Sequence, residues 1–286
     1  MATAAGTPRR TRRARERRGQ VVAYAVVVIF LLWVLVPIAV IVSNSLKPTG
    51  DIFADPPHWL FSPTLSHFRA IFGDLHFDQY FENSTIVAGG SSLLSLLLGT
   101  PAAYALARLP IRGREWWARL ALFARMVPAI VLVVPMYTMF RQAGLIGSYW
   151  ALIFAHTAFN LPLVIWMMRS FFEDIPISLE EAGRVDGAGS LGVFMRIALP
   201  LSAPGLTACG ILCVLFSWNE FLFALVLSGQ HTATMPIGVS SFIGSVSIDW
   251  GGSSAAAVLA MLPVFVLGLA VQRFLVRGLT MGAVKG

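Results

Sequence analysis

Charged residues are scarce in this chain of 286 residues, at 12% of the total, while hydrophobic residues reach 57%. Soluble globular domains carry about 25% charged residues. A chain with so few charges cannot cover the surface of a soluble domain of this size. The composition therefore argues strongly against a soluble enzyme and against a disordered chain. It favours an all-α integral membrane protein, because long apolar segments run through the sequence.

Cysteine and lysine are also rare. The two cysteines, Cys209 and Cys213, lie four residues apart in an apolar run, so they cannot bridge each other along a helix and are expected to pack. Neither of the two lysines, Lys47 and Lys285, stands in the G-x4-G-K-[ST] pattern that holds nucleotide phosphates. The five histidines form no H-E-x-x-H or similar motif. The sequence predicts no catalytic residue, no metal site and no cofactor bound by this chain.

Six apolar segments are long enough to cross a membrane. The first, residues 21–42, carries no charge and would extend about 33 Å as a helix. This length, without a convincing cleavage site, distinguishes the segment from a signal peptide. Five further transmembrane helices are expected at about residues 84–109, 119–140, 149–168, 204–227 and 254–276.

The basic residues predict the orientation of these helices. Seven arginines lie between Arg9 and Arg18, directly before the first apolar segment. A basic run can bind nucleic acid, but beside an apolar span it is typical of a cytoplasmic flank. Most other basic residues fall in loops on the same side. We therefore expect residues 1–20 and 277–286 to be cytoplasmic tails, residues 43–83 to be an extracytoplasmic loop, and no nucleic acid to be a partner.

The second apolar segment carries a small residue at every fourth position: Ser91, Ser95 and Gly99. Small residues at this spacing allow a neighbouring helix to approach closely. We expect this stripe to be a helix-packing face, in preference to a groove for substrate.

Glu220 is the one acid deep within a predicted span, where a carboxylate must be paired or face water. Trp218 and Asn219 precede it, and Asn160 lies in the fourth span. An aromatic ring suits the apolar face of a sugar, and amide or carboxylate groups suit its hydroxyls. These four residues therefore form a candidate substrate path.

An equally weighted alternative is that Glu220 forms hydrogen bonds between helices and never contacts substrate. Arg125, in the third span, is a candidate ion partner for it. His156, in the fourth span, is expected to be packed or hydrogen-bonded, in preference to a catalytic role.

The polar stretch of residues 172–203 is patterned. Ser178 and Glu181 form a capping box that predicts a helix start at Ser178. Arg184 can pair with Glu180 one turn before it, and Gly187 and Gly189 follow as helix-ending residues. The pattern fits either a surface connector or a peg that docks in another protein. A second short helix is expected to carry four apolar residues on one face: Leu191, Phe194, Met195 and Ala198.

Within this stretch a signature is present over twenty residues. Glu181-Ala182-Gly183, then Gly187 after three residues, then Ile197-Ala198-Leu199-Pro200 after nine more resemble the EAA signature of ABC importer permeases, E-A-A-x3-G-x9-I-x-L-P. Gly183 stands where a second alanine is usual, which keeps a close contact possible at some loss of helix stability. Three further stretches are similar to the carbohydrate branch of this family: residues 63–68, residues 217–221, and residues 278–286, which resemble the end of the second permease subunit of maltose-type importers.

The resemblance implies a type I ABC importer permease fold with six transmembrane helices, the last five in a core of residues 84–276. It implies four kinds of partner in a bacterial inner membrane: a second, different permease subunit, two ATP-binding subunits that hold ATP and Mg, an extracytoplasmic solute-binding protein, and the lipid bilayer. The expected function is import of a sugar or polyol. The alternative is a stand-alone secondary carrier with Glu220 as its proton site.

The resemblance also implies which residues contact the ATP-binding subunits. Two groups are expected, one in the coupling loop of residues 172–203 and one in the C-terminal tail. They are Glu180, Glu181, Ala182, Gly183, Asp186, Gly187, Ile197, Leu199 and Pro200 in the loop, and Thr280, Val284, Lys285 and Gly286 in the tail.

Overall fold

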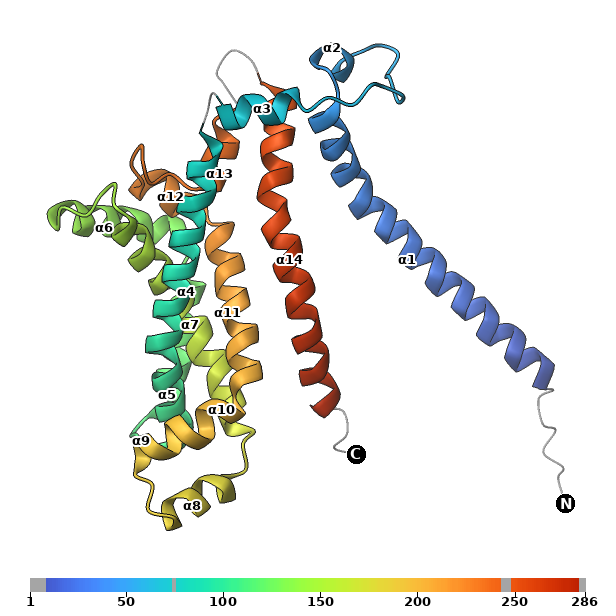
Figure 1. Ribbon diagram of the computed structural model, residues 1–286. Helices are drawn as coiled ribbons and strands as arrows, with labels where there is room; N and C mark the ends of the chain where they lie inside the picture. The colour runs from blue at the N-terminus through green and yellow to red at the C-terminus, as the bar shows by residue number, and fades with distance from the viewer. Residues whose placement is uncertain (1–8, 74–75, 243–247, 283–286) are drawn as a thin grey trace, which may run out of the picture.

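The computed structural model describes residues 9–73, 76–242 and 248–282, with side chains described for residues 19–272 within these ranges. Every element of it is helical (Figure 1). The elements are α1 (Arg9–Leu46), α2 (Thr49–Ile52), α3 (Ser66–Gly73), α4 (Phe77–Arg108), α5 (Arg114–Met126), α6 (Ala129–Gln142), α7 (Tyr149–Glu173), α8 (Ile177–Val185), α9 (Ser190–Val193), the π-helical turn η1 (Phe194–Ala198), α10 (Leu199–Leu201), α11 (Ala203–Trp218), α12 (Leu222–Leu227), α13 (Met235–Ser240) and α14 (Trp250–Gly282).

The core of the molecule is formed by α4, α7 and α11, which pack along one another. The small residues of α4 make this possible. The hydroxyls of Ser91 and Ser217 lie 2.8 Å apart between α4 and α11, and a Cβ added at Gly99 would lie 2.6 Å from Cγ1 of Val164 on α7. The prediction that the stripe Ser91, Ser95 and Gly99 is a packing face is confirmed.

The contact of Gly99 gives a prediction of stability. Gly99→Val would force side-chain atoms into Val164, and overpacking of this kind costs about 1–3 kcal/mol. We expect a lower thermal unfolding temperature in detergent. Gly89→Val is the matched control, because Gly89 is exposed on the same helix with open space around its Cα. Equal unfolding temperatures for the two variants would contradict this account of the helix contact.

The third and fifth predicted spans are not continuous helices. The third is divided into α5 and α6, whose axes differ by 93°. Val127 is extended (ψ 122°) because it precedes Pro128, and Pro128 also lacks an amide hydrogen. The fifth is divided into α11 and α12, and residues 190–201 meet α11 at an angle of 74°.

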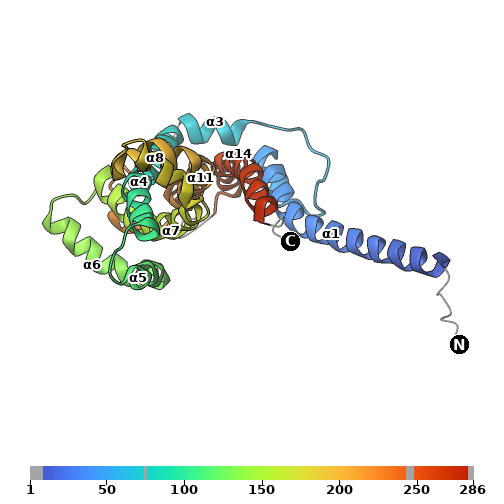
Figure 2. The same cartoon turned by 90° about the horizontal axis from the view of Figure 1, so that it is seen from below.

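Within the part of the chain that the structure describes, four helices are long and apolar enough to cross a membrane, and the number rises to six if each bent pair counts as one span. α1 leaves the bundle, and its most apolar stretch is wholly unburied (Figure 1). Viewed along the bundle, α14 lies between α1 and the core (Figure 2). The start of α1, the end of α14 and α8 all lie at one end of the molecule.

Candidate functional site

The coupling loop places α8 at the end of the bundle, below α4 and α7 (Figure 1). The helix begins at Ile177 after Pro176, with no side-chain cap, so the predicted capping box of Ser178 and Glu181 is wrong. Proline before the first turn starts the helix instead, since its fixed φ of −56° is already close to helical. The predicted end is confirmed, because Gly187 has a φ of +87°, which side chains other than glycine rarely adopt.

One face of α8 is fixed to the rest of the chain. Glu180 is buried and accepts a hydrogen bond from Arg108 Nε (2.7 Å) and one from the Tyr104 hydroxyl (2.9 Å). The predicted pairing with Arg184 is present at 4.0 Å. Three residues after Glu180, Gly183 lies against Ile197 of η1. Glu180 and Gly183 therefore point into this chain, although both were expected at the ATP-binding subunit.

The opposite face of α8 is exposed. It presents Glu181, Ala182, Val185 and Asp186, and Val185 is 87% exposed. Among the described residues Glu181 has no ion-pair partner. α8 thus presents a mixed apolar and acidic surface to its surroundings.

The second short helix of the loop differs from its prediction. Phe194 and Ala198 are buried, but Leu191 and Met195 are exposed, so the four residues do not share a face. The reason is the π-helical turn η1, in which residues five apart align, as the fully buried Val193 and Ala198 do. In the EAA signature Ile197 and Leu199 are half-buried and Pro200 is exposed.

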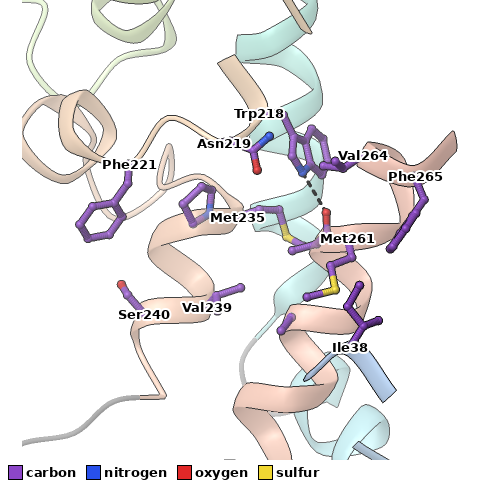
Figure 3. A pocket seen from close by; sticks show the side chains of 13 residues that line it. Ile38, Trp218, Asn219, Phe221, Met235, Val239, Ser240, Met261, Val264 and Phe265 are labelled. Carbon is purple, nitrogen blue, oxygen red and sulfur yellow. Dashed lines mark hydrogen bonds between the residues drawn. The ribbon is translucent and has the colours of Figure 1, made fainter. Parts of the chain in front are cut away.

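A pocket of about 580 Å³ lies where α11 breaks, between α13 and α14 (Figure 3). Its volume is in the range of small-molecule sites. The Trp218 indole borders it and donates a hydrogen bond from Nε1 to the Ala260 carbonyl (3.1 Å). Asn219, which also lines the pocket, donates one amide hydrogen to the Leu215 carbonyl (2.8 Å), which leaves its carbonyl oxygen and its second amide hydrogen to bind a ligand. Ser240 also lines the pocket, and the rest of the wall is apolar: Ile38, Phe221, Met235, Pro236, Val239, Ala257, Ala260, Met261, Val264 and Phe265.

Asn160 and Glu220 lie away from this pocket, so the four candidate path residues are not brought together. Asn160 is buried between α7 and α11, where it donates to Ser217 Oγ (3.0 Å) and the Cys213 carbonyl (3.3 Å). Both cysteines are fully buried, as expected. Only Trp218 and Asn219 of the four face the pocket.

Glu220 joins two helices. Its carboxylate accepts hydrogen bonds from the backbone amides of Phe223 (2.9 Å) and Ala224 (3.2 Å), which caps α12. Its Oε2 also lies 3.3 Å from Nε2 of the buried His156 on α7. This placement fits the alternative in which Glu220 contacts a neighbouring helix, here through an ion-pair contact with His156 that is not a hydrogen bond.

Arg125 is not the ion partner of Glu220. It donates to the Phe159 carbonyl (3.1 Å), and its guanidinium lies over the rings of Phe159 and Phe216. The position of His156 opposite Glu220 was not expected, because nothing in the sequence indicates which residue of α7 faces the break. Of the tail residues expected at the ATP-binding subunits, Val284, Lys285 and Gly286 lie outside the described residues, and Thr280 is described only as part of α14.

Comparison with known families gives the context for this geometry. Residues 95–281 match the model of the family described as binding-protein-dependent transport system inner membrane component. The chain belongs to this family. It is therefore a membrane permease and a transport subunit, and it is not an enzyme. Residues 172–203 lie within the matched range.

Relatives match this permease over most of its length. The trehalose transport system permease protein SugB of Mycobacterium tuberculosis is 38% identical over 258 residues, 89% of this chain and 93% of that protein. The trehalose/maltose transport system permease protein MalG of Thermococcus litoralis is 36% identical over 244 residues, 82% and 88% of the two chains.

The fold of the permease is also found in solved structures. A bacterial ABC transporter involved in the import of the acidic polysaccharide alginate matches with a TM-score of 0.77 at 23% identity, over 94% of this chain and 99% of that one. The expected all-helical type I ABC importer permease fold is confirmed. ATP hydrolysis in such a transporter takes place in separate subunits.

Proposed function

We propose that this permease forms half of the translocation path of an ATP-driven importer for a sugar or polyol. A second, different permease subunit supplies the other half. Two ATP-binding subunits, which hold ATP and Mg, bind the end that carries α8, and an extracytoplasmic solute-binding protein delivers substrate at the opposite end. Two relatives are permease proteins of transport systems for trehalose and for trehalose and maltose, which supports a sugar as the substrate class.

The observation that carries this proposal is the two-sided character of α8. Glu181, Ala182 and Asp186 are exposed, while Glu180 on the other face is buried and paired. The exposed face of such a helix can bind another subunit, while its buried face transmits the resulting movement to the bundle. Gly183, Gly187, Ile197, Leu199 and Pro200 shape the loop that holds it, and Thr280, Val284, Lys285 and Gly286 form the second contact with the ATP-binding subunits.

The substrate path in this proposal passes the pocket at the α11 break. The ring of Trp218 borders an apolar wall, and the oxygen of Asn219 is placed for a sugar hydroxyl. Asn160 and Glu220 act behind this surface by holding α7 and the break together.

The proposed orientation in the bacterial inner membrane rests on which elements share one end of the molecule. α8 lies at the end where α1 begins and α14 finishes. With α8 in the cytoplasm, residues 1–20 and 277–286 are cytoplasmic and residues 43–83 are extracytoplasmic, in agreement with the distribution of arginine.

Deletion of the gene in its host is the direct test. Uptake of radiolabelled trehalose, maltose or sorbitol is measured in the deletion strain and after restoring the full chain. We expect one of these uptakes to be lost and then recovered, to stop when arsenate depletes ATP, and to continue with a protonophore. Uptake that persists without ATP while the proton gradient is intact would favour a secondary carrier and overturn the proposal. Unchanged uptake of all three compounds would overturn the substrate class.

A further inference from the structure

Arg108, the last residue of α4, joins three helices at the end of the bundle that carries α8. Its Nε donates to Glu180 of α8 (2.7 Å). Its Nη2 donates to the carbonyls of Phe172 (2.6 Å) and Ile175 (2.5 Å), at and just beyond the end of α7. The side chain is only 9% exposed, and that of Glu180 only 2%.

The burial of two charged side chains is not expected if α8 only connects two spans at the surface. Two charges are removed from water here, which is unfavourable unless both are paired and fully hydrogen-bonded. The pairing is extensive: one Glu180 oxygen binds Arg108 and the other binds the Tyr104 hydroxyl (2.9 Å). The Phe172 carbonyl is in the last turn of α7, where a cation is favoured, and it accepts from the Ile175 amide (3.2 Å) as well as from Arg108.

The same contacts determine how α8 can move. Glu180 and Gly183 are the two buried residues of α8, and they lie one turn apart on one face. Glu180 binds α4 and, through Arg108, α7, while Gly183 packs on Ile197. A push on the exposed face of α8 is therefore received by α4 and α7 at one point.

We infer that Arg108 is a positioning residue that transmits displacement of α8 to α4 and α7 as one rigid unit. The inference rests on the proposed function, in which α8 is the element moved by the ATP-binding subunits. In this inference the buried Arg108–Glu180 pair transmits the movement within the permease, whereas the exposed residues of the EAA signature contact the ATP-binding subunits. Arginine is required because its planar fork reaches three acceptors, which an ammonium group cannot do in the same geometry.

The first test measures whether α8 and α4 keep a fixed distance during the transport cycle. Spin labels are placed at Leu179→Cys on α8 and Leu98→Cys on α4, both exposed and outside the face of Glu181 and Val185, in the complete transporter in nanodiscs. Cys209 and Cys213 are fully buried and are left in place. We expect the same label distance without nucleotide and with ATP and vanadate, and a different or broader distribution in Arg108→Ala. A distance that shifts between the nucleotide states of the otherwise wild-type complex, or an Arg108→Ala distribution like the wild type, overturns the inference.

The second test measures coupling. In proteoliposomes, Arg108→Ala is expected to lower the sugar imported per ATP hydrolysed by between about 5-fold and 100-fold while ATP hydrolysis continues, and Arg108→Lys is expected to lie between it and the wild type. Arg112→Ala is the control, an exposed arginine four residues further on, in the loop between α4 and α5. An unchanged ratio in Arg108→Ala overturns the inference. If Arg108→Ala fails to assemble, Arg108→Lys is measured in the same way, and an unchanged ratio in it has the same meaning.

An exchange of the two charges tests whether Arg108 holds α7 as well as α8, or only forms an ion pair with Glu180. Arg108→Glu with Glu180→Arg is not expected to restore coupling, because a carboxylate at position 108 would face the carbonyls of Phe172 and Ile175. Restored coupling would show that α7 is not held and would overturn the inference. A wild-type complex that contains no ATP-binding subunit would instead overturn the proposed function, whatever the variants do.

Discussion

A Glu181→Lys permease is expected to fold normally and to lose at least about nine-tenths of its sugar uptake. Glu181 is exposed and makes no ion pair among the described residues, so the reversal should not disturb this chain. At a protein interface a misplaced charge costs several kcal/mol, and about 1.4 kcal/mol already corresponds to a tenfold change in binding. Uptake by whole cells, together with the amount of permease in the membrane, measures the effect.

Asp174→Lys is the matched control for this charge reversal. Asp174 is also exposed and lies at the same end of the molecule, directly after α7 and outside α8. The two variants change the net charge of the loop equally, so only the position differs. Normal uptake with Glu181→Lys would show that the exposed face of α8 is not the coupling surface.

Glu220→Ala is expected to destabilise the permease by about 2–3 kcal/mol. The change removes the cap of α12, which alone is worth about 0.5–2 kcal/mol, and leaves the buried His156 without the group it faces. The break that places Trp218 and Asn219 in the pocket would then be poorly fixed, so uptake should fall as well. Thermal unfolding in detergent and uptake at reduced temperature measure the two effects.

Glu220→Gln distinguishes the cap from the charge. Its amide oxygen can still accept from the Phe223 and Ala224 amides, so an intermediate stability is expected. Asn219→Ala is a control for stability, because the side chain of Asn219 is exposed and, among the described residues, bonds only to Leu215 at the end of its own helix. If Glu220→Ala unfolds at the wild-type temperature, the carboxylate does not hold the break.

The features that the sequence predicted are those that depend on local pattern. Apolar length located the six segments, and the fixed spacing of the EAA residues located α8 and its end at Gly187. Small residues every fourth position indicated the packing face of α4. Each of these follows from the geometry of one helix, so no knowledge of neighbouring elements was needed.

The features that it did not predict depend on which distant residues meet. Glu220 and His156 are 64 positions apart, and Arg108 and Glu180 are 72 apart. Proline gave no reliable indication of helix breaks either. Pro128 ends a helix while Pro135 remains inside the next one, because neighbouring elements decide whether the lost hydrogen bond is tolerated.

The right-angled corner at Pro128 has a consequence for the surrounding lipid. α5 has 13 residues and spans only about 20 Å, whereas the hydrocarbon layer is about 30 Å thick. Beyond the corner α6 turns aside and exposes Ile130, Val131 and Val134. The permease therefore presents a shorter apolar wall on this flank than along α4. We expect the bilayer to thin beside it, which makes the rate of transport sensitive to acyl-chain length.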